Sequence, residues 1–482
     1  MFIQIHMLQS MPPGNLNRDE TGQPKKCIFG GVTRGRISSQ CLKRNIRRSQ
    51  QFKEAFGDAL GERTTYLPQM VADELAKDGM LDVSKEELDQ LMAAIAGRFK
   101  KEKSRKESEE TEEENTPAVD TSESAGDEVG QTGQLVFFPP PFARRVAELL
   151  AQFRKEKPAA YHLFVTGEIN ETAEQRATRK AKGKELKERK KAISVEKKGA
   201  TTDDEKAAIK EKEDALMKDE QQYKEDSQNA VKALKKEIDS LFANIAKASK
   251  SLTVDIGLFG RMTTSDLVVN VEATCQVAHA ISTHETVIES DYFTAMDDCK
   301  AEYAASQMDK AGAAFLGSGE TETFYSASVY YKYLNLDLDA LRKHLSQNKK
   351  GWPDSEASKT VGILLMAAAL ANPTGKQNSF ASHGIPELIL VELSNVKRPI
   401  SYANAFLEPV EGPNYLARSA DALKTYVEAV TPAFAPADID RYLLAVGHAK
   451  TEIGGAVRVE TLDKLAETVG RASITPRVGA TP

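Results

Sequence analysis

Cysteine is scarce in this chain, and long hydrophobic runs are absent. The four cysteines form no CxxC pair and match no zinc-binding spacing. A disulfide framework is therefore not expected, and reduced thiols in a cytoplasmic protein are the simplest interpretation. No apolar run reaches the roughly eighteen residues of a transmembrane helix. The first residues, MFIQIHML, lack the basic start and apolar core of a signal peptide, so none is expected.

Motifs that carry catalysis or hold cofactors are also missing. The glycines of FGGVTRG (29–35) are not followed by the GK[ST] of a nucleotide-binding loop. His279 and His284 are five residues apart and do not share a helical face, and Asp297 with Asp298 has no partner motif. No HExxH or Ser/His/Asp pattern occurs. We therefore predict no catalytic residue, no cofactor and no metal site.

Charge is unevenly distributed along the chain. The formal net charge is −6, which argues against a generally basic nucleic-acid binder. However, residues 107–128 contain ten acids and no Lys or Arg, and the remainder of the chain therefore carries +4 (−6 plus 10). Residues 1–50 contain nine Lys or Arg against two acids, a net of +7. This asymmetry predicts a localised basic site and a separate acidic segment.

The strongest basic stretch is IFGGVTRGRISSQCLKRNIRRSQ (28–50). A serine at 38–39 is a suitable N-cap, and Leu42 with Ile46 would form the inward face of the helix that follows. The basic residues would then form two outward ridges, Lys43/Arg47 and Arg44/Arg48. Such a helix N-terminus suits a phosphate oxygen, and the ridges suit successive phosphates. A merely solvated helix face is the alternative.

Strand and helix patterns alternate, which indicates an α+β fold. Strands are predicted at 2–8, 323–338 and 387–393, and Ile3, Ile5 and Met7 would share one face of the first. Residues 11–24 read as a loop. Helices are predicted at 83–101, after the prolines of 139–141, and at 361–371, 421–430 and 440–449. The Lys/Glu/Ala-rich segment 171–250 reads as two long charged helices with a break near 201–204.

Several longer stretches resemble one known family. They are FIQIHMLQSMPPGNLNRDETGQPKKCIFGGVTRGRISSQCLKRNIRRS, GLFGRMTTSDLVVNVEATCQVAHAISTHE, DYFTAMDD, GSGETETFYSASVYYKYLNLDL, GKQNSFASHGIPELILVEL and RPISYANAF. In this order they are similar to the CasC family, the backbone subunits of the type I-E CRISPR interference complex, Cascade. The resemblance covers 1–75 and 250–410.

The resemblance implies an RRM-like (ferredoxin-like) palm with an inserted helical domain and a protruding thumb hairpin. On this chain the first part of the palm is expected at 1–78, and the helical insertion at 79–250. The thumb and the remainder of the palm are expected at 251–482. Within the insertion, 102–133 reads as an acidic disordered linker and 171–250 as the charged hairpin. Both look like additions to the family pattern.

The family also implies a function without catalysis. Several copies stack along a CRISPR RNA (crRNA), grip its phosphate backbone and present the guide in segments for pairing with target DNA. The implied partners are crRNA, target DNA, further copies of this chain and the other Cascade subunits. These are the large subunit, the small subunit, the subunit that caps the 5′ handle and the crRNA-processing endoribonuclease. No membrane partner and no cofactor are implied.

RNA-binding residues are carried over position by position. Arg18 and Lys25 lie in the NLNRD loop and its continuation. Arg261 and Met262 belong to the thumb, where the flexible methionine can wedge against a base. Lys376 matches a basic loop near the RNA. The grip on the RNA backbone is expected to consist of Arg34, Arg36, Ser38, Ser39, Gln40, Lys43, Arg44 and Arg47.

Two other functions remain open from the sequence. A type III-like backbone subunit would cleave target RNA with a divalent metal, and Asp19 is the candidate acid for that reaction. A coiled-coil scaffold without nucleic acid would explain 171–250, but it would leave the basic stretch at 28–50 unexplained.

Overall fold

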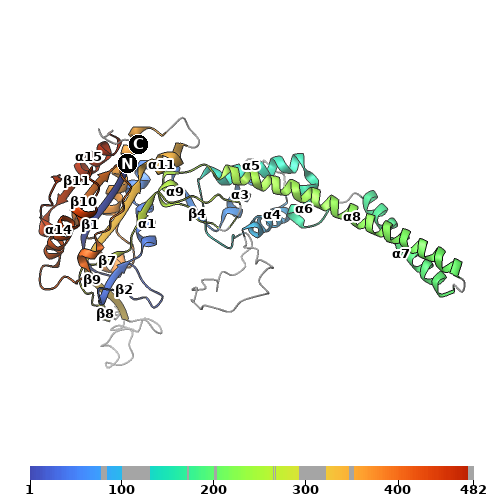
Figure 1. The fold of residues 1–482 in the computed structure, drawn as a ribbon, viewed down its shortest axis with the longest axis horizontal. Helices are drawn as coiled ribbons and strands as arrows, with labels where there is room; N and C mark the ends of the chain where they lie inside the picture. Colours follow the sequence, from blue (N-terminus) through green and yellow to red (C-terminus); the bar gives the residue numbers. More distant parts are fainter. Residues whose placement is uncertain are drawn as a thin grey trace, which may run out of the picture. The chain divides into compact units, whose positions relative to one another are not determined.

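The computed structural model describes residues 1–77, 84–99, 131–170, 173–199, 203–263, 265, 267–292, 322–346 and 352–475 (Figure 1). The chain forms two compact units. Unit 1 comprises Met1–Leu60, Leu252–Arg261 and Val271–Pro482, and unit 2 comprises Gly61–Ser251 and Met262–Asn270. Unit 2 is therefore an insertion in the chain of unit 1. Residues 61–77, which the sequence analysis placed with the first part of the palm, belong to unit 2.

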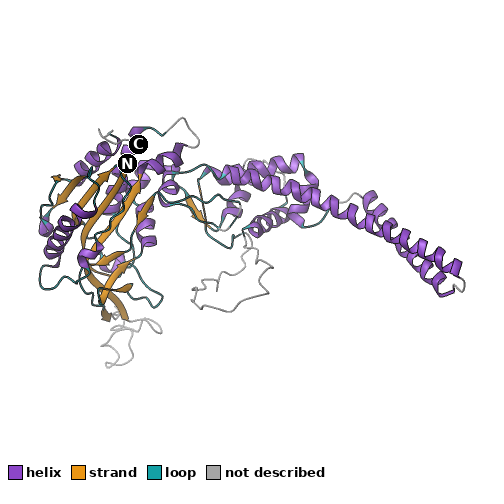
Figure 2. Ribbon diagram, in the orientation of Figure 1, coloured by secondary structure: helices purple, strands orange, loops and turns teal. Residues whose placement is uncertain are grey.

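Unit 1 is built on one large sheet (Figure 2). Its main path runs β12-β11-β10-β1-β9-β7-β3-β2, and β6 and β8 also pair with β9. Only β11 and β12 pair in parallel among these strands. The strands are β1 (Phe2–Gly14), β2 (Lys26–Phe29), β3 (Val32–Ile37), β6 (Cys275–Val277), β7 (Ala280–Ser282), β8 (Glu289–Tyr292), β9 (Glu322–Asp337), β10 (Pro386–Ser394), β11 (Asp440–Ala445) and β12 (Ala456–Arg458).

Strand β1 lies at the centre of this sheet and shows the predicted alternation. Ile5 lies opposite Val391 of β10 and Leu334 of β9, and all three side chains are in one buried cluster. Leu8 faces the other way, into a second cluster. The predicted loop start at residue 11 is wrong, because β1 continues to Gly14 with a shift of register after Met11. This irregularity accommodates two prolines that cannot donate to a regular ladder.

Helices cover both faces of the sheet. Figure 1 shows α1 and α14 on opposite sides of it. The first face carries α1 (Ser39–Arg48), α2 (Gln50–Phe56), α9 (Val254–Phe259), α11 (Leu338–Leu345), α12 (Asp354–Leu370) and α15 (Leu462–Ile474). The second face carries η3 (Ala403–Phe406), α14 (Tyr415–Phe434) and η4 (Gly447–Ala449). Shorter elements are η1 (Gly57–Ala59) and α13 (Gln377–Phe380).

The helix predicted at 440–449 is wrong. Its first half is strand β11, and Leu443 and Leu444 enter the clusters on opposite faces of the sheet. A short apolar run cannot be assigned to helix or strand by periodicity alone. Pairing with β10 decides in favour of the strand, because Leu443 lies opposite Leu390 in the ladder.

Unit 2 is mainly helical and has a core of its own. It comprises β4 (Glu62–Thr64), α3 (Leu67–Lys77), α4 (Lys85–Arg98), β5 (Val136–Phe138), α5 (Pro141–Glu156), α6 (Pro158–Thr166), α7 (Ala173–Gly199) and α8 (Asp203–Ala248). The two long charged helices, α7 and α8, are confirmed. The acidic linker predicted at 102–133 lies almost entirely outside the described residues. Within those residues, no helix combines the length and apolar character needed to cross a bilayer.

Candidate nucleic-acid interface

Helix α1 begins as the sequence predicts. The Ser38 hydroxyl accepts a hydrogen bond from the Cys41 N–H at 3.3 Å, and Leu42 and Ile46 are buried. Ser39 is partly exposed and Gln40 is exposed on the first turn. Lys43 is partly exposed and Arg44 is exposed on the second turn. The positive end of the helix dipole and two cationic side chains therefore lie close together on α1.

The loop that contains the NLNRD motif is tied to the start of α1. The side-chain amide oxygen of Asn17 accepts a hydrogen bond from the Ser38 N–H at 2.9 Å. The backbone carbonyl of Asn17 accepts one from the Lys25 N–H at 2.8 Å. The Lys25 carbonyl in turn accepts from the Arg36 N–H at 2.8 Å. Lys25 is thereby fixed between β3 and α1. Arg18 is exposed in the same loop, where it forms a β-bridge with Pro24.

Positive side chains cluster around Lys25. Arg36 donates from Nη1 to Nδ1 of His279 at 3.2 Å. Partial desolvation and the charges of Arg36 and Lys25 lower the pKa of His279. Burial raises the pKa of the Cys41 thiol, while the nearby charges of Arg44 and Lys25 act in the opposite direction. Basic residues of the loop, of β3 and of α1 therefore contribute to one region of positive electrostatic potential.

Lys376 lies beside the same loop. A Cβ at Gly375 would fall 2.5 Å from the Asn15 carbonyl oxygen and 2.6 Å from that of Leu16, so the two backbones are in direct contact. Only glycine permits so close an approach. Lys376 itself has a φ of 48°, and its ammonium donates to the Thr323 hydroxyl at the start of β9. The structure thus brings a third segment of the chain to the interface.

The Arg34 side chain does not lie on the surface but is bound within the protein. It is fully buried, and its guanidinium donates to the carbonyls of Phe29 at 3.1 Å, Ser282 at 3.1 Å and Phe406 at 2.8 Å. Desolvation lowers the pKa of this guanidinium. The side chain fastens the β2–β3 hairpin to the rest of unit 1. We therefore remove Arg34 from the candidate phosphate contacts.

Arg47 is also occupied within the protein. Its Nε donates to Oδ2 of Asp255, a carboxylate with no exposed surface, at 2.9 Å. The two residues of the predicted ridge therefore differ, because Lys43 is partly exposed whereas Arg47 is held in an ion pair. The candidate residues that remain accessible are Lys25, Arg36, Ser39, Gln40, Lys43 and Arg44, flanked by Arg18 and Lys376, whereas Ser38 is buried as the N-cap of α1.

The two thumb candidates differ strongly in exposure. The Arg261 side chain is 3% exposed, and desolvation lowers its pKa to about 10. Its backbone forms a two-way hydrogen-bonded bridge with Val271 at 2.8 Å. Met262, the next residue, is 93% exposed. This exposure leaves Met262 accessible to a base, whereas Arg261 is held inside.

Asp19, the acid that an RNA-cleaving subunit would need, is engaged in its own loop. Its Oδ1 accepts hydrogen bonds from the Thr21 N–H at 2.9 Å, the Thr21 hydroxyl at 2.8 Å and the Gln23 N–H at 3.0 Å. The bond from the Thr21 side chain is the largest influence that lowers the Asp19 pKa. The carboxylate therefore stabilises the turn. In the described ranges, no three His, Cys, Asp or Glu side chains are grouped as metal ligands.

Two residues that hold members of the candidate interface in place were not predicted from the sequence. His279 matched no metal-binding or catalytic pattern, and Asn17 was given no separate role. Neither carries a local signal, because the partner Arg36 is 243 residues from His279 and Ser38 is 21 residues from Asn17. The sheet order, which places β3 beside β7, is what brings His279 to Arg36.

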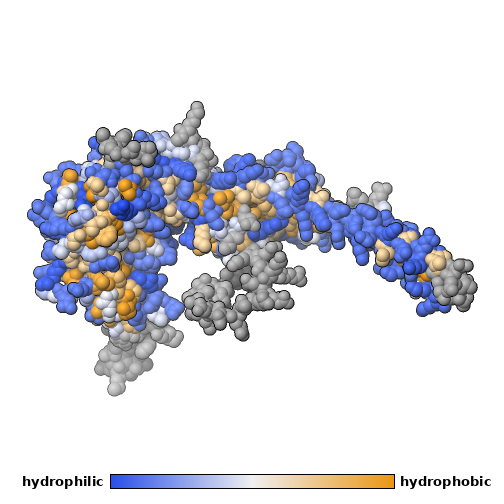
Figure 3. Space-filling view, in the orientation of Figure 1, coloured by the Kyte–Doolittle hydropathy of each residue, from blue (hydrophilic) through white to orange (hydrophobic). Residues whose placement is uncertain are grey.

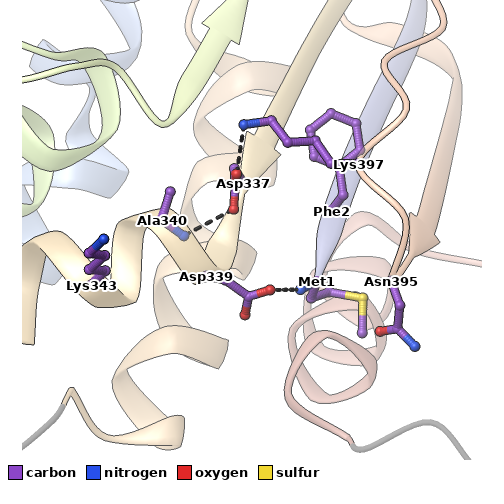
Figure 4. A pocket seen from close by; sticks show the side chains of 8 residues that line it. All are labelled: Met1, Phe2, Asp337, Asp339, Ala340, Lys343, Asn395 and Lys397. Atoms are coloured by element: carbon purple, nitrogen blue, oxygen red, sulfur yellow. Dashed lines mark hydrogen bonds and ion pairs between the residues drawn. The ribbon is translucent and has the colours of Figure 1, made fainter. Parts of the chain in front are cut away.

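A pocket elsewhere in unit 1 is lined by charged residues, but both of its carboxylates are already paired with basic groups of the protein. Figure 4 shows the Met1 amine directed at Asp339, and Lys397 directed at Asp337. The Lys397–Asp337 pair measures 2.8 Å, and Asp337 also accepts from the Ala340 N–H at 3.0 Å. Its carboxylates are therefore satisfied within the pocket, and the basic cluster around Lys25 remains the stronger candidate.

The sequence and the fold of this chain are similar to those of known proteins. The model of the Cas_CT1975 family, described as CT1975-like protein, matches residues 3–194 and 164–470. A chain of a "CRISPR RNA-guided surveillance complex, pre-nicking" superposes with a TM-score of 0.61 at 23% identity, covering 98% of this chain and 100% of that chain. A chain of a second CRISPR RNA-guided surveillance complex gives a TM-score of 0.55 at 20% identity, with 98% and 100% covered. At these identities the likeness establishes the fold. No curated protein matches the sequence.

Proposed function

The chain belongs to the CT1975-like protein family, and from this premise we propose that it is the backbone subunit of a type I-E CRISPR Cascade, the CasC subunit. Several copies assemble along a crRNA in the cytoplasm, hold its phosphates and present the guide to target DNA. The proposal is supported by the two solved structures of similar fold, which are chains of CRISPR RNA-guided surveillance complexes. The partners are crRNA, target DNA, further copies and the other Cascade subunits.

The proposed fold of the palm is RRM-like. Support comes from the chain order β1, α1, β6/β7, β9, α12, β10 and from the antiparallel spatial order β10-β1-β9-β7. This is the arrangement of a ferredoxin-like β-α-β-β-α-β unit. An RRM normally stacks bases on aromatic residues of the open sheet face. Here Tyr331, Tyr333 and Tyr402 are buried under α14, so the proposed RNA path follows the basic cluster instead.

The single observation that carries the proposal is the convergence on the start of α1. Lys25, Arg36 and Arg44 come from a loop, a strand and a helix, and they share one region of positive potential beside the partly exposed Ser39 and the exposed Gln40. Lysine and arginine bound to phosphates give affinity without reading bases. Base pairing by the guide then supplies the sequence specificity, as in other RNA-guided systems.

We also propose that the subunit does not cleave RNA. The three local hydrogen bonds to Asp19 support a structural role for its carboxylate. The competing type III-like function predicts metal-dependent cutting of RNA complementary to the guide, abolished by Asp19→Asn. An intact complementary RNA in the presence of Mg²⁺ or Mn²⁺ is the result expected here.

The test is co-expression of the chain with a CRISPR array and its neighbouring genes, followed by purification and sequencing of the bound RNA. A particle with many copies of this chain and discrete spacer-containing RNAs is expected. Lys43→Ala with Arg44→Ala should reduce the slope of log affinity against log salt by about 1.4 for two lost phosphate contacts. Two exposed lysines elsewhere in unit 1, Lys343 and Lys450, provide the matched control pair. An RNA-free monomer would contradict the proposal.

A further inference from the structure

Arg36 and His279 form an unusual pair, because both side chains are able to carry a positive charge. Nη1 of Arg36 lies 3.2 Å from Nδ1 of His279, and this is the only hydrogen bond of the Arg36 guanidinium in the described part of the chain. A guanidinium can only donate, so Nδ1 must accept, and the ring is neutral with its proton on Nε2. His279 is exposed and Arg36 is partly exposed, so a ligand can reach the pair.

Positive charges around His279 oppose its protonation while no ligand is bound. Partial desolvation and the charges of Arg36 and Lys25 lower the pKa of the ring. Helix α1 packs against β6 and adds Lys43, whose charge reaches Cys275 of that strand. A second proton on the ring therefore lacks a counter-charge.

The other charged groups of the neighbouring elements are engaged elsewhere. Asp255 of α9 is paired with Arg47 at 2.9 Å. The Lys332 ammonium of β9 donates to a backbone carbonyl of α12. Glu285, the acid that follows β7 in the chain, acts on the buried Arg34 of β3. None of these groups supplies the negative charge that a protonated ring would need.

We propose that RNA binding at the α1 interface is coupled to the uptake of one proton by His279, which then binds the same phosphate group as Arg36. The proton comes from solvent and adds to Nδ1, which ends the hydrogen bond from Arg36. Both side chains are then donors, and phosphate oxygens accept from them. The phosphate also offsets the charges that oppose protonation. The inference rests on the proposed function, because it concerns the regulation of the same site.

Affinity for RNA should rise as the pH falls. The pH window lies between the pKa of His279 in the free protein, which is below the ordinary value of 6.5, and its higher value in the complex. One proton limits the change in affinity to about tenfold per pH unit. Lysine and arginine do not titrate in this window, so their phosphate contacts add affinity without this pH dependence.

The pH dependence also separates phosphate binding from apolar contact with bases. Hydrophobic residues do reach the surface of unit 1 (Figure 3). Ile28 and Val287, for example, are 71% and 69% exposed. Contact between such residues and a base moves no proton, so it should leave the pH profile flat.

The test is a titration of the purified full chain with labelled single-stranded oligouridine, whose bases take up no proton in this range. Affinity is measured from about pH 5.5 to about pH 8 at constant ionic strength, because phosphate contacts depend on salt. The test variant is His279→Gln, since glutamine can still accept from Arg36 and donate to a phosphate but does not titrate. The control is His448→Gln, which removes an exposed histidine of η4.

The ratio of wild-type to His279→Gln affinity should grow severalfold as the pH falls, whereas the His448→Gln profile should follow the wild type. Histidine ring resonances provide a second measurement. The resonance that is absent from His279→Gln should titrate at a higher pH in the RNA complex than in the free protein. Parallel affinity profiles for His279→Gln and the wild type would overturn the inference, as would an unchanged ring pKa in the complex.

Failure of this inference is distinguishable from failure of the proposed function. A wild-type protein that binds no RNA at any pH would defeat the proposed function. A wild-type protein that binds RNA with the same pH profile as His279→Gln would defeat only the coupling to His279.

Discussion

Arg47 and Asp255 form a buried ion pair that joins α1 to the start of α9. Nε of Arg47 lies 2.9 Å from Oδ2 of Asp255, whose other oxygen accepts from the Thr253 hydroxyl at 2.6 Å and the Ile256 N–H at 3.1 Å. The Arg47 side chain is 15% exposed and that of Asp255 is 0% exposed. One turn earlier, Lys43 makes no ion pair within the described part of the chain. Within one ridge, Arg47 therefore stabilises the fold, whereas Lys43 remains available to a ligand.

Arg47→Ala should destabilise unit 1 by about 3 kcal/mol, because it leaves a buried carboxylate without its counter-charge. Lys43→Ala should leave stability almost unchanged but weaken RNA binding, since it removes one phosphate contact. Urea denaturation and the amount of co-purified RNA measure the two effects. The reverse outcome, a stable Arg47→Ala protein that has lost its RNA, would return Arg47 to the RNA interface.

Gly375→Ala should displace the loop at 15–18 from the segment that carries Lys376. The new Cβ would overlap two backbone carbonyl oxygens, those of Asn15 and Leu16, and backbone cannot rotate away as a side chain can. We expect at least a severalfold loss of RNA affinity. Gly97→Ala is the control, because its Cβ would meet nothing within 4 Å. Equal RNA affinities for the two variants would show that this contact does not shape the interface.

Lys332 should make stability depend on pH. Its side chain is buried and its ammonium donates to the Ala368 carbonyl at 2.7 Å, and desolvation lowers its pKa to about 7. Below that pH the lysine is protonated in the folded and the unfolded chain alike. Between about pH 7 and the ordinary lysine pKa, only the unfolded chain keeps the proton, so stability rises with pH, by at most about 1.4 kcal/mol per unit.

Lys332→Met removes this titration. The difference in unfolding free energy between the wild type and Lys332→Met should therefore grow in favour of the wild type from about pH 7 to pH 9. Urea denaturation of both proteins across this range measures it. The absolute stability of the variant is not diagnostic, because methionine also leaves the Ala368 carbonyl without its donor. Parallel pH profiles would contradict the assignment of a lowered pKa.

Local sequence patterns were sufficient to predict several helices and strands. The alternation of Ile3, Ile5 and Met7 identified the face of β1, and Ser38 identified the start of α1 with Leu42 and Ile46 inward. The long charged helices were predictable from composition and spacing. Cap residues and hydrophobic periodicity act within a few residues, so they can be read without knowledge of the fold.

The roles of individual arginines were not predictable in this way. Arg34 and Arg36 are two residues apart on β3, yet the first is buried among carbonyls and the second lies beside His279. The Phe406 partner of Arg34 is 372 residues away in the chain. The sequence shows that a basic residue is present, but only the sheet order shows what surrounds it. The same holds for β11, whose identity as a strand depends on its pairing with β10.

The division of the chain has a consequence for how this protein tolerates change in length. Unit 1 is interrupted between Leu60 and Leu252, and the hairpin has a hydrophobic seam separate from the core of unit 2. Doubling a flexible connection costs only about 0.6 kcal/mol in closure entropy. The outer part of the hairpin can therefore be shortened, extended or replaced by a foreign domain while the sheet of unit 1 keeps all its neighbours, which makes it the natural place to graft a reporter.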